Sequence, residues 1–144
     1  MVFKVPVVCL LAACLAGTAS ASDWIYYGKK GKTSLAVDLE SAEFDIPAKT
    51  GKAWVRIEFK PPKLYGTKKI ASVMSHEEVD CDSRKLATLQ TVGYDASGSV
   101  VISSDTPGKM ETQIPDTTGE ATVEAICLAL QAQKASDENT GKKQ

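Results

Sequence analysis

KAWVRIEFK, residues 52–60, alternates apolar and polar side chains along its whole length. One side of this stretch carries Ala53, Val55, Ile57 and Phe59. The other side carries Trp54, Arg56, Glu58 and Lys60. A period of two is typical of a β-strand with one buried face. Proline has no backbone N–H to donate to a sheet, so Pro61-Pro62 should end the strand.

The same period recurs on both sides of this strand. Residues 95–98, DASG, predict a hairpin turn in which Gly98 takes a positive φ. The four residues 81–84 predict another turn between two longer alternating runs. In chain order, strands are expected at residues 24–27, 35–39, 52–60, 69–80, 85–94 and 99–103, with a weaker candidate at 110–114.

The pattern changes from strand to helix after Pro115. Thr117 is followed three residues later by Glu120, which is the spacing of a capping box. Apolar residues then recur at helical spacing, at Val123, Ile126, Cys127 and Leu130. A helix is expected from about Thr118 to Lys134, followed by a disordered polar tail over 135–144. The fold class is therefore α+β: one antiparallel sheet of about five or six strands with a C-terminal helix on one face.

The first 21 residues have the three-part layout of a secretory signal. Lys4 precedes an apolar run, and Ala19-Ser20-Ala21 forms a cleavage site before Ser22. The apolar run is shorter than the about 20 residues of a membrane span. Leu11-Ala12-Ala13-Cys14 also fits a bacterial lipobox, in which Cys14 would be lipidated, although the sequence favours cleavage after Ala21. In both cases export to the periplasm, the outer membrane or the cell surface is expected, with the folded domain over 22–134.

The net charge limits which partners are expected, and the cysteine count predicts how the domain is stabilised. Without the first 21 residues the chain has 16 basic and 18 acidic residues, so its net charge is −2. Nucleic acid is not an expected partner, and membrane contact is expected only through lipidation. With Cys9 and Cys14 in the signal region, Cys81 and Cys127 remain, and an even pair in an oxidising compartment predicts one disulfide. This bond would tether the helix and stabilise the domain by about 4 kcal/mol.

HEEVDCDSRK, residues 76–85, is the densest group of chemically reactive side chains in the chain. It contains the single histidine, which cannot supply the several ligands of a catalytic zinc site. A nucleophilic Cys81 would need a free thiolate and a base, whereas a disulfide would remove the thiolate. The segment is therefore interpreted as a strand end, with weak calcium binding by Glu78, Asp80 and Asp82 left open. GKKGKT, residues 28–33, has two residues between its glycines where a phosphate-binding loop has four.

These features predict a protein that is not an enzyme and has no catalytic residues, metal or cofactor. An ordered set of residues along the chain also has the arrangement of a known family. The set comprises Trp24, Val37-Asp38, Trp54-Val55, Asp80-Cys81, Arg84, Gly93–Gly98, Ile114-Pro115, Glu120 and Cys127. In this order it resembles the surface-adhesin protein E-like family of bacterial envelope proteins. One departure is Met110, because the family often has a tryptophan shortly before the Ile-Pro pair.

The resemblance implies an antiparallel sheet whose C-terminal helix is held on one face by a disulfide. It also implies an envelope location and, as in the namesake, adhesion to host matrix or serum glycoproteins. The chain would then be an exported binding module that presents a sheet face, an edge strand or a loop to a protein ligand. The alternative is a periplasmic accessory or structural protein with no host ligand. A homodimer is compatible with both.

Trp54 is the main candidate for a contact with a partner. It shares its side of the strand with Arg56, and tryptophan and arginine are enriched at binding hot spots. If the helix covers this side, however, Trp54 is a core residue. The sequence favours the core interpretation, because Trp54 is the largest side chain available to pack beneath the helix. Tyr65 is a further candidate contact whose environment the sequence leaves undecided.

Overall fold

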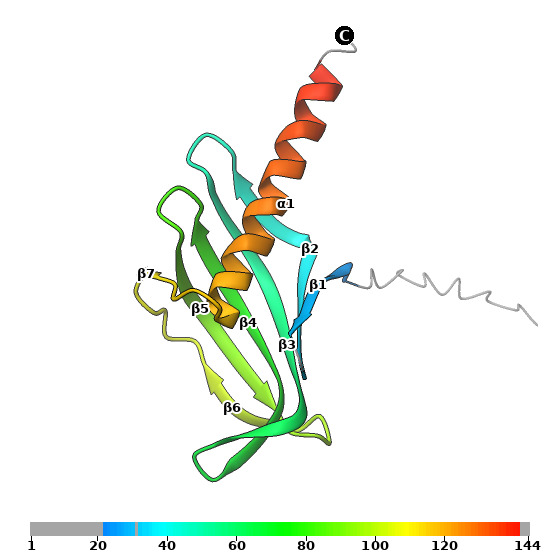
Figure 1. Cartoon of the computed structure of the whole chain (residues 1–144), viewed down its shortest axis with the longest axis vertical. Coiled ribbons are helices and arrows are strands. Elements are labelled where there is room, and N and C mark those ends of the chain that lie inside the picture. Colours follow the sequence, from blue (N-terminus) through cyan, green and yellow to red (C-terminus); the bar gives the residue numbers. More distant parts are fainter. Residues whose placement is uncertain (1–21, 31, 142–144) are drawn as a thin grey trace, which may run out of the picture.

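The computed structural model describes residues 22–30 and 32–141, which form seven strands followed by one helix (Figure 1). The strands are β1 (Trp24–Lys30), β2 (Thr33–Asp45), β3 (Thr50–Tyr65), β4 (Lys68–Asp80), β5 (Lys85–Tyr94), β6 (Val100–Ser104) and β7 (Glu111–Thr112). The helix is α1 (Thr118–Gly141). The predicted signal over 1–21, which contains Cys14, and the last three residues lie outside the described residues.

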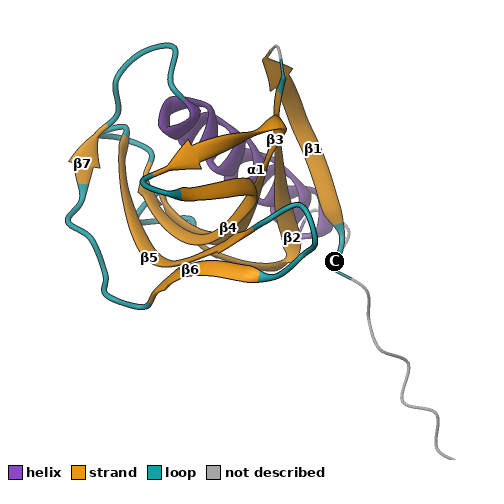
Figure 2. Cartoon of the chain, turned by 90° about the horizontal axis from the view of Figure 1, so that it is seen from below, coloured by secondary structure: helices purple, strands orange, loops and turns teal. Residues whose placement is uncertain are grey.

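The sheet is an antiparallel meander in which strands that follow one another in the chain also pair in space. Its order is β1-β2-β3-β4-β5-β6, and the two-residue β7 pairs with the other end of β5. Figure 2 shows that the sheet is strongly curved and that α1 lies against one of its faces. The predicted α+β class, with one open sheet and a C-terminal helix, is confirmed.

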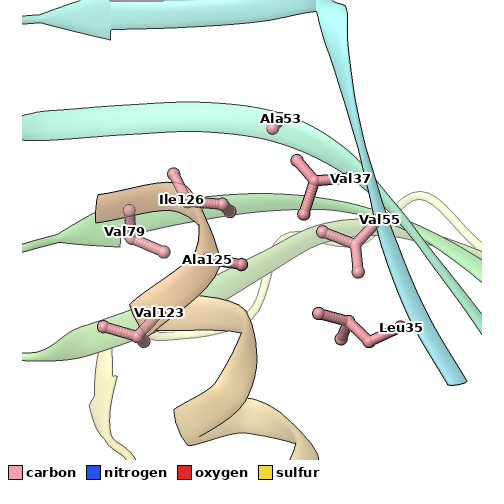
Figure 3. Close-up of a cluster of buried hydrophobic side chains, with 8 residues drawn as sticks. All are labelled: Leu35, Val37, Ala53, Val55, Val79, Val123, Ala125 and Ile126. Atoms are coloured by element: carbon pink, nitrogen blue, oxygen red, sulfur yellow. The ribbon is translucent and has the colours of Figure 1, made fainter. Parts of the chain in front are cut away.

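The hydrophobic core lies between α1 and the face of the sheet that we call the helix face. Strand side chains point into it from β2, β3 and β4, and helix side chains point back from the first turns of α1 (Figure 3). The eight buried members are Leu35, Val37, Ala53, Val55, Val79, Val123, Ala125 and Ile126. Burying each of the larger aliphatic side chains contributes about 1.5–3 kcal/mol. This small set is therefore the main source of stability that the fold has outside its disulfide.

The helix covers the opposite side of β3 from the one that the sequence favoured. Ala53 and Val55 are fully buried beneath α1, whereas Trp54 lies half-buried on the other side of the sheet, which we call the open face. The reason is volume. Small side chains on β3 let the helix come close, and a Cβ at Gly51 would already lie 3.0 Å from Cγ2 of Ile126. An indole beneath α1 would separate the two layers, so the core interpretation of Trp54 is wrong.

The helix extends seven residues beyond its expected end at Lys134, so most of the segment expected to be a disordered tail is helical. The side chains beyond that point are exposed, and they carry no apolar stripe that could have predicted the extension. Bonds within the helix support this part: Gln133 donates to Asp137 at 2.8 Å, and the Thr140 hydroxyl donates to the Ser136 carbonyl at 3.0 Å. Figure 1 shows this end of α1 projecting past the sheet.

Strand β3 also continues through Pro61-Pro62, where the sequence predicted that it would end. The pairing of β3 with β4 shifts between Glu58 and Lys63, so the two prolines fall where no ladder partner is required of them. Pairing then resumes and reaches Tyr65, opposite Lys68. A proline pair is tolerated in a long strand when it coincides with such an irregularity.

The turns and the helix start follow their local sequence signals. Gly98 has a φ of 84°, as the hairpin turn predicts. The carboxylate of Asp95 accepts hydrogen bonds from the Ser97 hydroxyl and backbone N–H groups of the same turn, which lower its pKa. At the helix start the Thr117 hydroxyl accepts from the Glu120 N–H at 3.3 Å. The Glu120 carboxylate accepts from the N–H of Asp116, one residue earlier than in a standard capping box.

The predicted disulfide joins Cys81, in the turn between β4 and β5, to Cys127 on α1. The two Cα atoms are 5.8 Å apart and the two residues are 46 positions apart in the chain. The bond therefore fixes α1 to the end of the sheet where β4 turns into β5. It also closes a loop of the chain that contains β5, β6 and β7.

Removing this bond should destabilise the domain and loosen α1. We expect the double variant Cys81→Ala with Cys127→Ala to lose about 4 kcal/mol of unfolding free energy, because the unfolded chain regains the freedom of the loop. Urea denaturation followed by circular dichroism measures this loss. Reduction of the native protein should lower its midpoint to that of the variant, and reduction of the variant should change nothing. An unchanged midpoint would show that the bond has no structural role.

Glu77 is the acidic residue that the alternation of β4 turns toward the helix face. It is buried, and its carboxylate accepts a hydrogen bond of 2.8 Å from the Thr88 hydroxyl. Burial raises its pKa above the ordinary value of 4.5, and hydrogen bonds from Ser75 and Thr88 offset part of this effect. The folded state therefore holds the proton more tightly than the unfolded state. The free energy of unfolding falls as the pH rises from the ordinary glutamate pKa to the raised pKa of the folded state.

Glu77→Gln should therefore raise the unfolding free energy at about pH 7, because the amide keeps an acceptor for Thr88 without a buried charge. The gain should shrink as the pH falls below the ordinary glutamate value, where both states are protonated. Thermal melts of the native protein and the variant between about pH 3 and pH 8 measure the difference. Glu78→Gln, on the open side of the same strand, is the matched control. A pH-independent loss of stability in Glu77→Gln would contradict the prediction.

Candidate functional site

The segment HEEVDCDSRK does not gather into one site. Strand alternation places His76 and Glu78 on the open face and Glu77 on the helix face, and Cys81 is bonded to the helix. Asp80 caps the turn, because its carboxylate accepts from the N–H groups of Asp82 and Ser83 at 3.0 Å each. These bonds, that of Ser83 first, lower the pKa of Asp80. The segment is a strand end and a turn, as the sequence predicted.

The three carboxylates left open for calcium each have a separate partner. Asp82 pairs with Lys49 at 2.9 Å, and Glu78 lies 3.7 Å from Lys52. Within the residues that the structure describes, no three histidine, cysteine, aspartate or glutamate side chains are grouped as a metal site requires. The glycine–lysine stretch at 28–33 connects β1 to β2, so it has no helix behind it to bind phosphate.

The open face instead carries a row of large polar and aromatic side chains. The register of five neighbouring strands aligns one residue from each strand across the sheet, in the order Trp24, Asp38, Trp54, His76 and Gln90. The rings of Trp54 and His76 stack, with centroids 5.1 Å apart and planes 16° from parallel. A stack of this kind holds both rings in one orientation. We call these five residues the open-face row.

Asp38 sits between the two tryptophans of this row and is only 4% exposed. Its carboxylate accepts hydrogen bonds from the Ser41 hydroxyl at 2.8 Å and from the Glu40 N–H at 3.1 Å. Beside the row is a hollow of about 350 Å³, whose walls include Trp24, Trp54, Met74, Val92 and Tyr94. The open face is therefore shallowly recessed at its centre, where aromatic and aliphatic side chains surround the buried Asp38.

The three predicted contact residues fall on two different surfaces. Arg56 lies one row beyond Trp54 on the open face, where its guanidinium contacts the Glu58 carboxylate at 2.9 Å. Tyr65 is at the end of β3, at the tip of the β3–β4 hairpin, and it is 66% exposed. The structure brings Trp54 and Arg56 together and places Tyr65 on another part of the molecule.

Sequence reasoning missed Trp24, His76 and Tyr94 as neighbours of Trp54. Alternation along each strand could have placed His76 on an outward side, but not opposite Trp54. That placement depends on the register of β3 with β4, which shifts between Glu58 and Lys63, and the neighbouring strand pairs have register shifts of their own. The site is therefore assembled by strand pairing, which local sequence does not determine.

Comparison with known proteins agrees with this architecture. The sequence model of the family described as surface-adhesin protein E matches residues 24–128, from β1 into α1. A crystal structure of Haemophilus influenzae protein E, in crystal form II, superposes with a TM-score of 0.53 at 17% sequence identity. This match covers 80% of the present chain and 94% of that protein.

A second structure of Haemophilus influenzae protein E has 18% identity and a TM-score of 0.49, over 78% of the present chain and 89% of the other. No curated protein sequence matches the chain. At 17% identity the crystal form II structure establishes a common fold, and the family assignment comes from the sequence model. Because that model covers most of the chain, the protein belongs to the surface-adhesin protein E family.

Proposed function

We propose that the protein is an exported bacterial envelope module that binds a protein ligand through the open face of its sheet. The observation that carries this proposal is the stacked pair Trp54–His76 on the face that α1 leaves uncovered, in a chain of an adhesin family. The buried core between α1 and the sheet does not include Trp54, so the indole is left for contacts on the open face. Here the core is complete without it.

The chemistry of the open face suits a protein partner. Tryptophan, tyrosine and arginine carry most of the binding energy in protein interfaces, because they bury large areas at small entropic cost. A second row beside the open-face row contains Tyr26 and Arg56 on either side of the small, buried Ala36. The backbone beneath both rows is held by continuous strand pairing, so these side chains are presented on a rigid support.

Export is the second part of the proposal. The family is one of surface adhesins and not of enzymes, which supports a location outside the cytoplasm. Residues 1–21 would act as the signal, with the domain over 22–134, and the mature chain would begin at Ser22 or at a lipidated Cys14. Within the described part of the chain, no helix is both long and apolar enough to cross a membrane. A periplasmic accessory role without a host ligand is the alternative that localisation tests.

Processing can be tested directly on the protein from its native cells. We expect the intact mass to correspond to a chain that begins at Ser22, or to a chain that begins at a diacylated or triacylated Cys14. Fractionation of the same cells should place the protein in the periplasm, the outer membrane or the medium. A full-length product in the cytoplasm would contradict export and the proposal with it.

Binding can be tested with immobilised human serum glycoproteins and basement-membrane extract, using surface plasmon resonance. We expect Trp54→Ala to weaken binding by about 30-fold, which corresponds to a hot-spot loss of about 2 kcal/mol. Ile114→Ala is the matched control, because Ile114 is 71% exposed and lies outside both rows. Circular dichroism melts of both variants verify that the fold is kept.

Two results would count against the open face. If the native protein binds and Trp54→Ala binds equally well, the ligand uses another surface. If the native protein binds nothing in either preparation and fractionates as a soluble periplasmic protein, the accessory role is favoured instead.

A further inference from the structure

We propose that the hairpin between β3 and β4 is a membrane-docking element that binds anionic phospholipid surfaces. The element consists of residues 60–69, KPPKLYGTKK, and we call it the basic hairpin. It lies on a different part of the molecule from the open-face row, so the proposal goes beyond the protein-binding function above. In Figure 1 this green hairpin lies at the end of the molecule opposite to the end where α1 terminates.

The charge of the basic hairpin is the first observation. Its ten residues include four lysines, Lys60, Lys63, Lys68 and Lys69, and no aspartate or glutamate. Lys32 from the β1–β2 turn lies beside it, because the Lys32 carbonyl accepts from the Lys60 N–H at 2.8 Å. The whole chain has a net charge of −1, so the basic hairpin is a cationic segment in a weakly acidic protein. The net charge of the chain predicted no attraction to an anionic membrane. That total does not show the local excess of positive charge in the basic hairpin.

The apolar tip is the second observation. Leu64 is 70% exposed and Tyr65 is 66% exposed, although both are large side chains of the kind that usually pack. Each is paired across the hairpin with a lysine, Leu64 with Lys69 and Tyr65 with Lys68. Gly66, with a φ of 59°, makes the turn that brings these pairs together. An aliphatic and an aromatic side chain flanked by lysines match the interface between lipid headgroups and acyl chains.

The base of the basic hairpin is anchored, which leaves the tip free to act as a unit. Ile70 is buried where β4 leaves the hairpin, against the surface made by Gly93 and Ile102. Lys63 lies over the ring of Phe59, 4.5 Å from its centroid. All residues from Lys60 to Lys69 are exposed. The Lys68 ammonium donates to the Val101 carbonyl of β6, whereas the Leu64 and Tyr65 side chains at the tip stay exposed, so the hairpin is a fixed projection with an uncovered apolar tip.

A lipid surface is the occupant that satisfies both observations together. Lysines alone would serve for any polyanion, but they would not explain two large apolar side chains at the very tip. Near an anionic bilayer each lysine contributes about a fivefold gain in binding, and the tip side chains gain further by leaving water.

Vesicle co-sedimentation tests this proposal, using the full chain with Cys14→Ser so that no acyl chain contributes. We expect binding to vesicles of about 30% phosphatidylglycerol in phosphatidylcholine, no binding to pure phosphatidylcholine, and release at high salt. Lys60→Ser with Lys69→Ser should weaken binding by about 25-fold. Leu64→Ser with Tyr65→Ser should also weaken it, at least tenfold, without changing the charge. Trp54→Ala should bind vesicles normally, which separates this proposal from the open-face function.

Matched controls decide whether these losses are specific. Lys109→Ser with Lys134→Ser removes two exposed lysines elsewhere, and Ile114→Ser removes an exposed apolar side chain elsewhere, so both should bind as the native protein does. The proposal is overturned if the native protein ignores phosphatidylglycerol or if the hairpin variants bind normally. It is also overturned if soluble heparin binds the native protein and the Leu64→Ser, Tyr65→Ser variant equally well while vesicles bind neither, which would identify a general polyanion site.

Discussion

The close approach of α1 to β3 is the constraint on which the rest of this structure depends. Gly51, Ala53 and Val55 leave so little side chain beneath the helix that Ile126 fits directly against the strand. Packing at this density admits no larger residue. Once the small side of β3 is committed to the helix, its alternation forces Trp54 and Arg56 to the other side. The composition of the open face is thus a consequence of how the core is filled.

Local features of the fold were predictable because each depends on a few neighbouring residues. The turn at Gly98, the helix start at Thr117 and the strands on either side of Cys81 all follow short-range signals. The disulfide was predictable because only Cys81 and Cys127 lie outside the predicted signal. The covered side of the sheet was not, because alternation defines two sides of a strand without saying which one receives the helix. The deciding quantity is the match of volumes between β3 and α1, which lie far apart in the chain.

The same limit applies to the site. Alternation identified Trp54 and Arg56 as neighbours on one side of β3, and they are. Alternation could not predict that His76 lies opposite Trp54, because this depends on strand register. It also could not predict that Tyr65 lies away from Trp54 and Arg56, because this depends on the length of the β3–β4 hairpin. The far end of α1 was missed for a related reason. Apolar periodicity marks only the part of a helix that packs against another element. Beyond Lys134 every described residue of α1 is exposed, so this part of the helix has no apolar stripe.

The way in which β5 is flanked has a further consequence for self-association. Its outer edge is divided between β6 at one end and β7 at the other, and the Gly108 N–H donates to the Thr88 carbonyl between them. No long row of unpaired backbone groups is left on β5. The edge strands on this side of the sheet are β6, with five residues, and β7, with two. Short margins are a recognised protection against edge-to-edge pairing of sheets. This edge of the sheet is therefore a poor template for strand pairing with a second copy of the protein, and filament growth through it is disfavoured.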